Sequence, residues 1–325
     1  MDITVSAATW QGLDAWVLES AEVRVVTLPP LGAKLVSLLD KRSGREWLAG
    51  ADDRPLRTIP YGAFFHEQDM SGWDEMFPTI VACAHPGPGA HHGAALPDHG
   101  EVWTLPWRLV EAESGRLTLA VEGKALPYRL SRTLAFSAPD TLELSYRLVN
   151  LGSDAMPYIW AAHPQFACGP DAEIIFPPEI TEVCNTLPAA WGWGVPETRF
   201  GWPIAVDMLG NRAWLNRVGP ATLRRGRKFF ARPDARPGWA AVRRATGDWL
   251  HLAWDAAQVP YLGFWVDEGA LSRQSVVAPE PTTGFYDSLA VAWERQAVTV
   301  IAAGATRAWS IRVRLGTSEQ VLAAG

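Results

Sequence analysis

The stretch YRLSRTLAFS at residues 128–137, followed by TLELSYRLVN at 141–150, decides the fold. Apolar and polar residues alternate through both segments, and β-branched and aromatic residues are frequent, which is typical of strands with one buried face. The residues between them favour a turn, so the two segments predict an antiparallel pair. The same pattern recurs in AEVRVVTLP at 21–29, RLTLAVEG at 116–123 and ATRAWSIRVRL at 305–315.

This strand pattern extends along the whole chain of 325 residues, and sustained helical periodicity is absent from the sequence. The 28 Gly and 25 Pro residues are spread along the chain and do not gather in one linker, so no change of composition marks a domain boundary. The sequence therefore predicts an all-β protein, residues 1–325 forming a single antiparallel domain. A sandwich and a barrel both fit the pattern.

Composition and charge exclude several classes of protein. A net charge of −6 disfavours a nucleic-acid partner, and no apolar run is long enough for a membrane helix. The N-terminal residues MDITVSAATWQG lack the features of a signal peptide, so we expect a cytoplasmic protein. The three cysteines form no CxxC pair, which argues against disulfides and structural zinc. Ten basic residues and one acidic residue lie between Arg212 and Arg244, as either a solvated loop face or an anion site.

Tryptophan is unusually frequent, with 17 residues, and three tryptophans lie in the long irregular segment 186–203. Each one separately is best explained as core. As a set, flat aromatic faces beside Asp and Glu acceptors also suit a sugar, whose C–H groups pack on rings while its hydroxyls donate to carboxylates. A second irregular segment, 83–103, is also long for such a fold, and loops of this length often carry function.

The seven histidines offer one weak metal pattern and two stronger catalytic candidates. His91, His92, His99 and Glu101 lie within eleven residues, but their spacing fits no established set of metal ligands, so we expect no metal. His251 lies in an apolar alternating stretch and is expected in the core. The sequence also contains no nucleotide-binding or hydrolase motif, so no cofactor is expected.

Three elements in a fixed order resemble the aldose 1-epimerase, or galactose mutarotase, superfamily. LPDHGEVWTLPW at 96–107 resembles its His-Gly element, NLGSDAMPYIWAAHPQF at 150–166 its His-Pro element, and VVAPEPTTGFYDSL at 276–289 its Glu-Pro element. The opening LPPLGAKLVSLLDKRSGREWL at 28–48 is also similar to the start of these proteins. The resemblance covers nearly the whole chain and implies the large antiparallel β-sandwich of that superfamily.

The resemblance also implies a reaction and its catalytic residues. Interconversion of the α and β anomers of an aldose requires a base for the anomeric hydroxyl and an acid for the ring oxygen. By carry-over, Glu280 is the base, His163 is the acid in its imidazolium form, and His99 is a second donor. Pro279 and Pro281 would hold Glu280 on a stiff extended segment, as Pro164 would hold His163. Alternatively, these X-Pro steps only end edge strands.

The sugar-binding residues are less clearly marked. Galactose-type members carry an Arg before the first His and an Asp between the second His and the Glu. No Arg fits here, since YGAFFHEQDMSGWDEMFPTI at 61–80 offers Asp69, Asp74 and Glu75 instead, while Asp207 and Asp234 both fit the Asp. We therefore expect the following substrate-binding residues: Asp74, Glu101, Trp160, Trp265 and Asp207.

These features predict an aldose 1-epimerase of a divergent branch that acts on a small-molecule sugar without a cofactor. One alternative is a non-catalytic carbohydrate-binding or sensing protein on the same scaffold. Another is a different acid–base reaction of a sugar, such as isomerisation or bond cleavage, with Glu280 and His163 as base and acid. A metal-dependent β-barrel enzyme is the remaining alternative. The sequence does not indicate the oligomeric state or the identity of the sugar.

Overall fold

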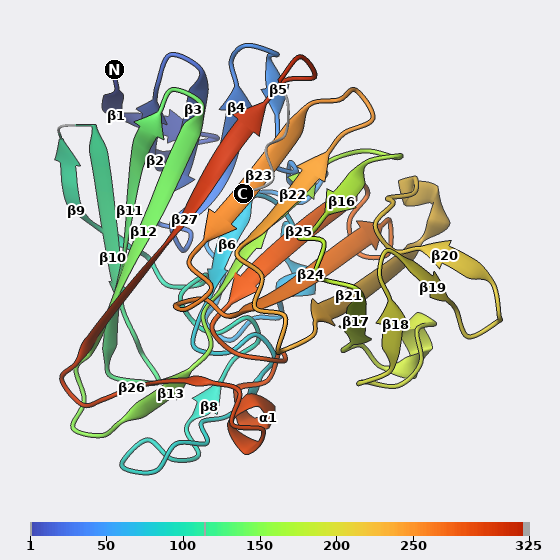
Figure 1. The fold of residues 1–325 in the computed structure, drawn as a ribbon. Helices are drawn as coiled ribbons and strands as arrows, with labels where there is room; N and C mark the ends of the chain where they lie inside the picture. The colour runs from blue at the N-terminus through green and yellow to red at the C-terminus, as the bar shows by residue number, and fades with distance from the viewer. Residues whose placement is uncertain (1, 114, 321–325) are drawn as a thin grey trace.

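The computed structural model describes residues 2–113 and 115–320, and two large antiparallel sheets dominate it. Figure 1 shows the two sheets facing each other, with the long strand β27 (Thr306–Gly316) crossing the front of the view. Every strand pairing within the two sheets is antiparallel, so the predicted all-β antiparallel sandwich is confirmed.

The larger sheet has 13 strands. Its main path begins with the N-terminal strands β1 to β4, continues through β6, β14, β25, β24 and β21, and ends with β17 and β18; β5 pairs with β4 and β15 with β25. The bounds are β1 Thr4–Trp10, β2 Leu13–Glu19, β3 Val23–Leu28, β4 Lys34–Asp40, β5 Arg45–Glu46, β6 Trp73–Met76, β14 Ala161–Pro164, β15 Phe166–Ala167, β17 Glu182–Asn185, β18 Arg199–Gly201, β21 Arg225–Ala231, β24 Tyr261–Glu268 and β25 Ser275–Thr282.

The smaller sheet has eight strands in the order β16-β22-β23-β27-β12-β11-β10-β9. All five segments expected as strands are strands, four of them in this sheet and the segment at 21–29 as β3. Alternate residues of β11 are buried, as its period-2 pattern predicts. The bounds are β9 Arg108–Glu113, β10 Arg116–Glu122, β11 Tyr128–Ala138, β12 Thr141–Asn150, β16 Glu173–Ile175, β22 Trp239–Arg243 and β23 Trp249–Trp254.

Short elements lie outside the two sheets. The described residues contain one α-helix, α1 (Leu289–Glu294), and none that is long and apolar enough to cross a membrane. The hairpin of β19 and β20 projects at the right of Figure 1. The remaining bounds are β7 Cys83–Ala84, β8 Ala95–Leu96, β13 Met156–Tyr158, β19 Ile204–Val206, β20 Arg212–Trp214, β26 Thr299–Ile301, and the 3₁₀ turns η1 Phe65–Glu67, η2 Ala189–Trp191 and η3 Ala221–Leu223.

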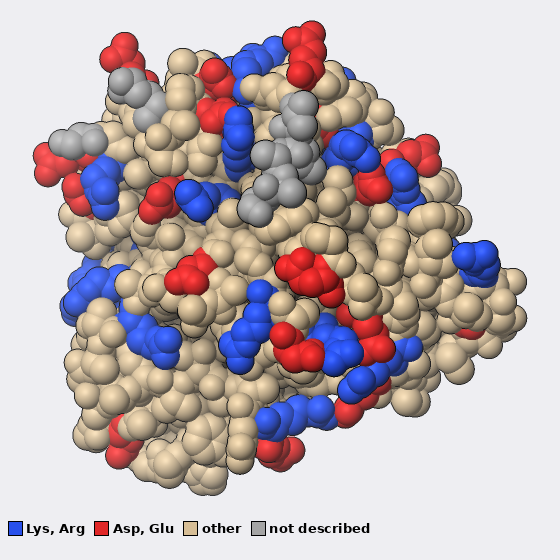
Figure 2. All heavy atoms as spheres, viewed as in Figure 1, with Lys and Arg blue, Asp and Glu red and all other residues tan. Residues whose placement is uncertain are grey.

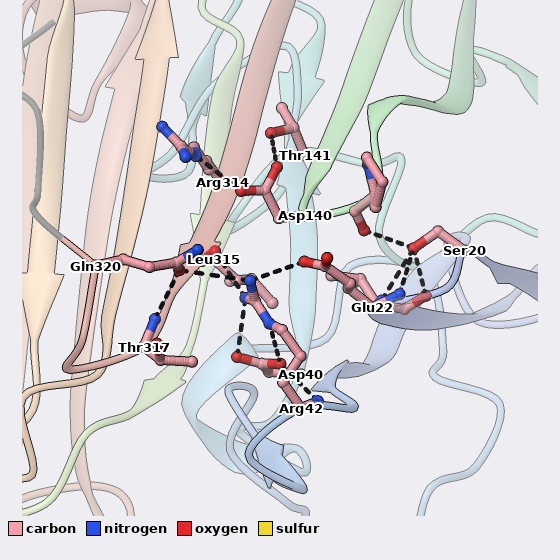
Figure 3. Close-up of polar contacts among 12 residues, drawn as sticks. Ser20, Glu22, Asp40, Arg42, Asp140, Thr141, Arg314, Leu315, Thr317 and Gln320 are labelled. Carbon is pink, nitrogen blue, oxygen red and sulfur yellow. Dashed lines mark hydrogen bonds and ion pairs between the residues drawn. The ribbon is translucent and has the colours of Figure 1, made fainter. Parts of the chain in front are cut away.

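A hydrophobic core fills the space between the sheets, with Leu35 and Val277 from the larger sheet and Leu144 and Val313 from the smaller one. Polar contacts also join the two sheets at one edge (Figure 3). There Arg42, after β4, donates to Glu22 and to the carbonyl of Leu315 on β27, each at 2.8 Å. These contacts hold the β4 end of the larger sheet against the smaller one.

The basic segment 212–244 is a solvated face only in part. Just under half of it folds into β20, β21 and β22, and Arg227 and Lys228 are buried, whereas most of its other basic side chains are exposed. Six of its ten basic side chains make ion pairs with carboxylates, so most of its positive charge is already paired. Figure 2 likewise shows basic and acidic side chains interspersed over the face in view.

Candidate functional site

The Glu-Pro element is a central strand, β25, and does not end at an edge. Residues 275–282 of β25 pair with β24 along their whole length. On the other side, β25 pairs with β15 at Val276 and Val277 and with β14 only at Thr282. Pro279 and Pro281 have no N–H, so this side cannot form a continuous ladder. The gap in the ladder lies at Glu280, beside the strand that carries His163.

Strand parity places the catalytic candidates on the outer face of the larger sheet. Glu75 contacts Arg132 and Tyr146 of the smaller sheet, so it points into the sandwich. The neighbouring Asp74 therefore points to the opposite face, where His163 lies directly across from it in the β6–β14 register. Asp74 on β6 and His163 on β14 thus both point away from the sandwich core, toward the outer face of the larger sheet.

A cavity of about 350 Å³ lies over this outer face, a size within the usual range for small-molecule sites. It contains the three residues expected to be catalytic, together with Trp265. Its polar lining residues are His66, Asp98, His99, His163, Gln165, Lys228, Glu280 and Asp287, and its apolar ones are Phe65, Met70, Ile80, Val81, Leu187, Trp191, Trp265 and Leu271.

Glu280 is completely buried and shares one cation with a second carboxylate. The Nζ atom of Lys228 lies 2.8 Å from Glu280 Oε2 and 3.0 Å from Asp287 Oδ1. Burial raises the pKa of Glu280 to about 7; Lys228 opposes this shift and Asp287 adds to it. The two carboxylates hold the pKa of Lys228 above its usual value despite burial. Glu280 is therefore suited to exchange a proton near neutral pH.

His163 is buried, and its Nε2 atom lies 3.9 Å from Glu280 Oε1 and 3.2 Å from the amide nitrogen of Gln165. Burial, followed by the charges of His99, Lys228 and Lys34, holds the pKa of His163 well below its usual value. The ring is therefore neutral at pH 7, whereas the expected acid role required an imidazolium. With the Gln165 amide as donor, Nε2 accepts and Nδ1 carries the proton.

His99 approaches from the segment 83–103, opposite the sheet. Its ring stacks on Phe65 with 4.3 Å between centroids, and its centroid is 5.1 Å from that of His163. Its Nδ1 atom lies 3.1 Å from Asp98 Oδ2, and this contact helps to lower the pKa of Asp98. The carboxylate also accepts the backbone N–H of Phe65, so Asp98 fixes both rings. Asp98 leaves His99 Nε2 free for a ligand.

The backbone geometry of the His-Gly element leaves no room for a side chain at its second residue, Gly100. Gly100 forms a bridge with Phe77, and a Cβ at this position would lie 2.0 Å from the Phe77 carbonyl oxygen. Its φ of +69° is also in the region that favours glycine, and His99 before it has a φ of +58°. The tight turn places the imidazole of His99 over the cavity.

Four of the expected substrate-binding residues do not line the cavity. Asp74 is buried beside Lys34, with its pKa raised to about 7 by burial. Trp160 points into the sandwich and donates to Glu75. Glu101 accepts from Tyr61 and from the backbone of residues 124 and 125, and Asp207 accepts from the backbone in the turn between β19 and β20. Only Trp265 of this set lies where a ligand in the cavity would touch it.

Twelve of the sixteen lining residues were not among the expected site residues, and the four most informative of them are Lys228, Asp287, Asp98 and Trp191. Lys228 lies in RRGRK, a segment whose composition is typical of a surface. Trp191 comes from the long segment 186–203, which the sequence did mark as a candidate functional loop. Asp98 directly precedes His99, and Asp287 lies in the quoted Glu-Pro element, so both were within reach of that interpretation.

No group of three or more His, Cys, Asp and Glu side chains in residues 2–113 and 115–320 is arranged to hold a metal ion. His91 and Glu101, which the sequence grouped loosely with His99, do not line the cavity that contains His99. The side chains of the cavity lining that can transfer a proton are carboxylates, imidazoles and one amine.

The structure is similar to solved structures of galactose mutarotase-like proteins. One from Lactobacillus casei has 18% identity and a TM-score of 0.69, covering 93% of this chain and 100% of that one. One from Clostridium acetobutylicum has 13% identity and a TM-score of 0.67, covering 97% and 99%. A galactose mutarotase related enzyme from Lactobacillus acidophilus has 14% identity and a TM-score of 0.66, covering 94% and 98%.

The fold is therefore the galactose mutarotase-like β-sandwich, as the resemblance in sequence predicts. No protein-family model matches the chain, and no curated protein sequence matches it either. At this level of identity the likeness establishes the architecture, and the function has to be argued from the cavity itself.

Proposed function

We propose that this protein is an aldose 1-epimerase that interconverts the α and β anomers of a sugar by acid–base catalysis. The observation that carries the proposal is the meeting of Glu280, His163 and His99 in one cavity from three distant parts of the chain. Glu280 Oε1 is buried and accepts no hydrogen bond from the described residues, and the anomeric hydroxyl is the partner that we assign to it.

The reaction begins with Glu280 as the base. The carboxylate takes the proton of the anomeric hydroxyl as the bond between C1 and the ring oxygen breaks, and the ring oxygen receives a proton. Because the pKa of Glu280 is about 7, the proton can be accepted and returned at comparable cost near neutral pH. Rotation about the C1–C2 bond and closure on the other face give the opposite anomer, with the roles of acid and base reversed.

The proton for the ring oxygen comes from the histidine side of the cavity. Neutral His163 offers an Nδ1 hydrogen that no other described group accepts. His99 is the better placed of the two to act as the acid, since the Asp98 carboxylate lies 3.1 Å from its Nδ1 atom, which orients the ring and leaves Nε2 for the ring oxygen. We therefore assign the acid role to His99 and a hydrogen-bond donor role to His163.

Lys228 and Asp287 are positioning residues in this scheme. Lys228 holds the Glu280 carboxylate through Oε2, which leaves Oε1 on the side of His163. Asp287 holds Lys228 from the other side. The ammonium also opposes the burial that would otherwise keep Glu280 protonated.

The proposal is tested by exchange NMR on a panel of aldoses, following the α and β anomer signals with wild-type protein and with Glu280→Gln. We expect faster exchange for at least one sugar, and a loss on the order of 10² to 10⁴ in the variant, the usual contribution of a general base. A sugar that binds both proteins without faster exchange would instead support a carbohydrate-binding or sensing protein, the second function that the tryptophans Trp191 and Trp265 favour.

A further inference from the structure

The cavity has a polar floor and apolar walls. The floor consists of side chains from the larger sheet, namely His163, Lys228 and Glu280, with Asp287 just after β25. The other polar residues of the lining are His66, Asp98, His99 and Gln165. The groups that would act on the anomeric hydroxyl and the ring oxygen are therefore concentrated in one part of the cavity.

Three sets of apolar side chains form the walls. Phe65 and Met70 are buried members of one hydrophobic cluster, and Leu271 packs against it. On another side, the rings of Trp191 and Trp265 meet edge to face, with 5.6 Å between centroids. Ile80, Val81 and Leu187 form the rest. A sugar hydroxyl directed at these walls would lose its water partners and gain none.

The cavity also has no Lys or Arg, among the residues that the structure describes, that is free of a carboxylate partner. Among the lining residues that the structure describes, Lys228 is the only Lys or Arg, and it is held between Glu280 and Asp287. Asp98 adds a third carboxylate. A phosphate or carboxylate on the substrate would be buried beside these negative groups without a partner, which is strongly unfavourable.

We infer that the substrate is an uncharged deoxy aldose, one whose substituents remote from C1 are hydrogen or methyl groups, and neither a phosphorylated nor an acidic sugar. This inference rests on the proposed function, since it places C1 and the ring oxygen at the polar floor. The remote carbons then face the apolar walls, where C–H and methyl groups pack on Trp191 and Trp265 and hydroxyls find no partner.

A series of sugars that differ only at C6 tests this inference. D-fucose, D-galactose, D-galacturonate and D-galactose 6-phosphate carry a methyl, a hydroxymethyl, a carboxylate and a phosphate, respectively, on the same ring. We expect kcat/KM for anomer exchange to be on the order of tenfold higher for D-fucose than for D-galactose. The two anions should be on the order of a hundredfold or more below D-galactose.

Affinity is measured separately by calorimetry with Glu280→Gln protein, so that the inference can be judged without turnover. If exchange is not accelerated but the affinities follow the same order, the proposed function fails and the inference on the ligand holds. If either anion binds better than D-galactose, or D-galactose better than D-fucose, the inference is overturned. Failure of all four sugars to bind overturns it as well.

The Leu271→Gln variant checks the role of the wall. Leu271 is only partly buried, so a side chain of similar size is tolerated there, and its amide offers a hydroxyl the partner that Leu lacks. We expect the preference for D-fucose over D-galactose to shrink severalfold. The exposed Leu109→Gln serves as the matched control and should leave the preference unchanged. An unchanged preference in Leu271→Gln would contradict a contribution of this wall to the selection against a remote hydroxyl.

Discussion

Lys228 on β21 lies 2.8 Å from Glu280 on β25, although β24 separates the two strands in the sheet. Glu280 is opposite Gly263 of β24, and a Cβ on Gly263 would lie 3.5 Å from Glu280 Oε2 and 3.1 Å from the ring of Phe230. The ammonium therefore reaches across β24 on the side where Gly263 presents no side chain to the Glu280 carboxylate. The ion pair joins residues of two strands that are not neighbours in the sheet.

The first prediction concerns the pH dependence set by Lys228. In Lys228→Met, the cation that lowers the pKa of Glu280 is lost, while burial and Asp287 still raise it. The pKa of Glu280 should rise from about 7 by roughly one unit or more. The lower limb of the kcat/KM profile for anomer exchange should shift to higher pH by the same amount. Lys41→Met, at an exposed ion pair, should leave the profile unchanged.

The second prediction concerns stability. Because the pKa of buried Glu280 is about 7 and its ordinary value is 4.5, the folded protein holds this proton more tightly than the unfolded chain does. The contribution of the protonated Glu280 carboxyl to the free energy of unfolding is fully present below pH 4.5 and is lost as the pH rises through 7. Glu280→Gln should therefore increase the free energy of unfolding at pH 8 by about 1–3 kcal/mol.

Urea unfolding at pH 8 and pH 5 measures this effect, since the gain should shrink at the lower pH, where the wild-type carboxyl is protonated. Glu179→Gln, at an exposed position, controls for the substitution itself. A gain of equal size at both pH values would show that ionisation of Glu280 is not its cause.

The third prediction concerns Asp98 and His99, which are expected to act as a unit. Asp98→Asn keeps an oxygen for the backbone N–H of Phe65 but removes the charge beside His99 Nδ1. We expect it to lower kcat/KM on the order of tenfold, and His99→Gln on the order of a hundredfold. The double variant should be no slower than His99→Gln alone. Additive losses would mean that Asp98 acts independently of the ring.

The fourth prediction concerns the tryptophan wall. A Cβ on Gly226 would lie 2.4 Å from Trp265 and 2.8 Å from Trp191, so Gly226→Ala must displace both rings. We expect KM for the sugar to rise on the order of tenfold with a smaller change in kcat, because the wall binds but does not react. Gly50→Ala is the matched control, since a Cβ there meets no atom within 4 Å. A loss confined to kcat would contradict this assignment.

The fold could be predicted from the sequence because the burial pattern of each strand can be read from the residues of that strand alone. The period-2 pattern of residues 128–137 and 141–150 reports directly which face of each strand is buried, and both are strands of the smaller sheet. His99, His163 and Glu280, which the three motifs single out, all line one cavity. Short segments with a strong steric requirement, such as Gly100 and the prolines of β25, remain recognisable in the sequence.

The rest of the site could not be predicted because it depends on strand parity in a sheet buried on both faces. All residues of β6 are buried, so the pattern does not reveal that Glu75 faces the sandwich and Asp74 the outer face. Lys228 could not be predicted for a similar reason, because the composition of RRGRK is typical of a surface segment. Only the structure shows that Glu280 and Asp287 lie beside its ammonium group. The neutral state of His163 depends on burial, which its own motif does not encode.

The floor of the cavity is built from strands of the sheet, whereas most of its walls come from the connecting segments that carry Phe65, Leu271 and Trp191. A change in a connecting segment leaves the ladders of β14, β21 and β25 intact. The base Glu280 and its neighbours on the sheet are thus encoded apart from most of the residues that set ligand preference, so mutation can retune the walls while this part of the reaction machinery is inherited unchanged.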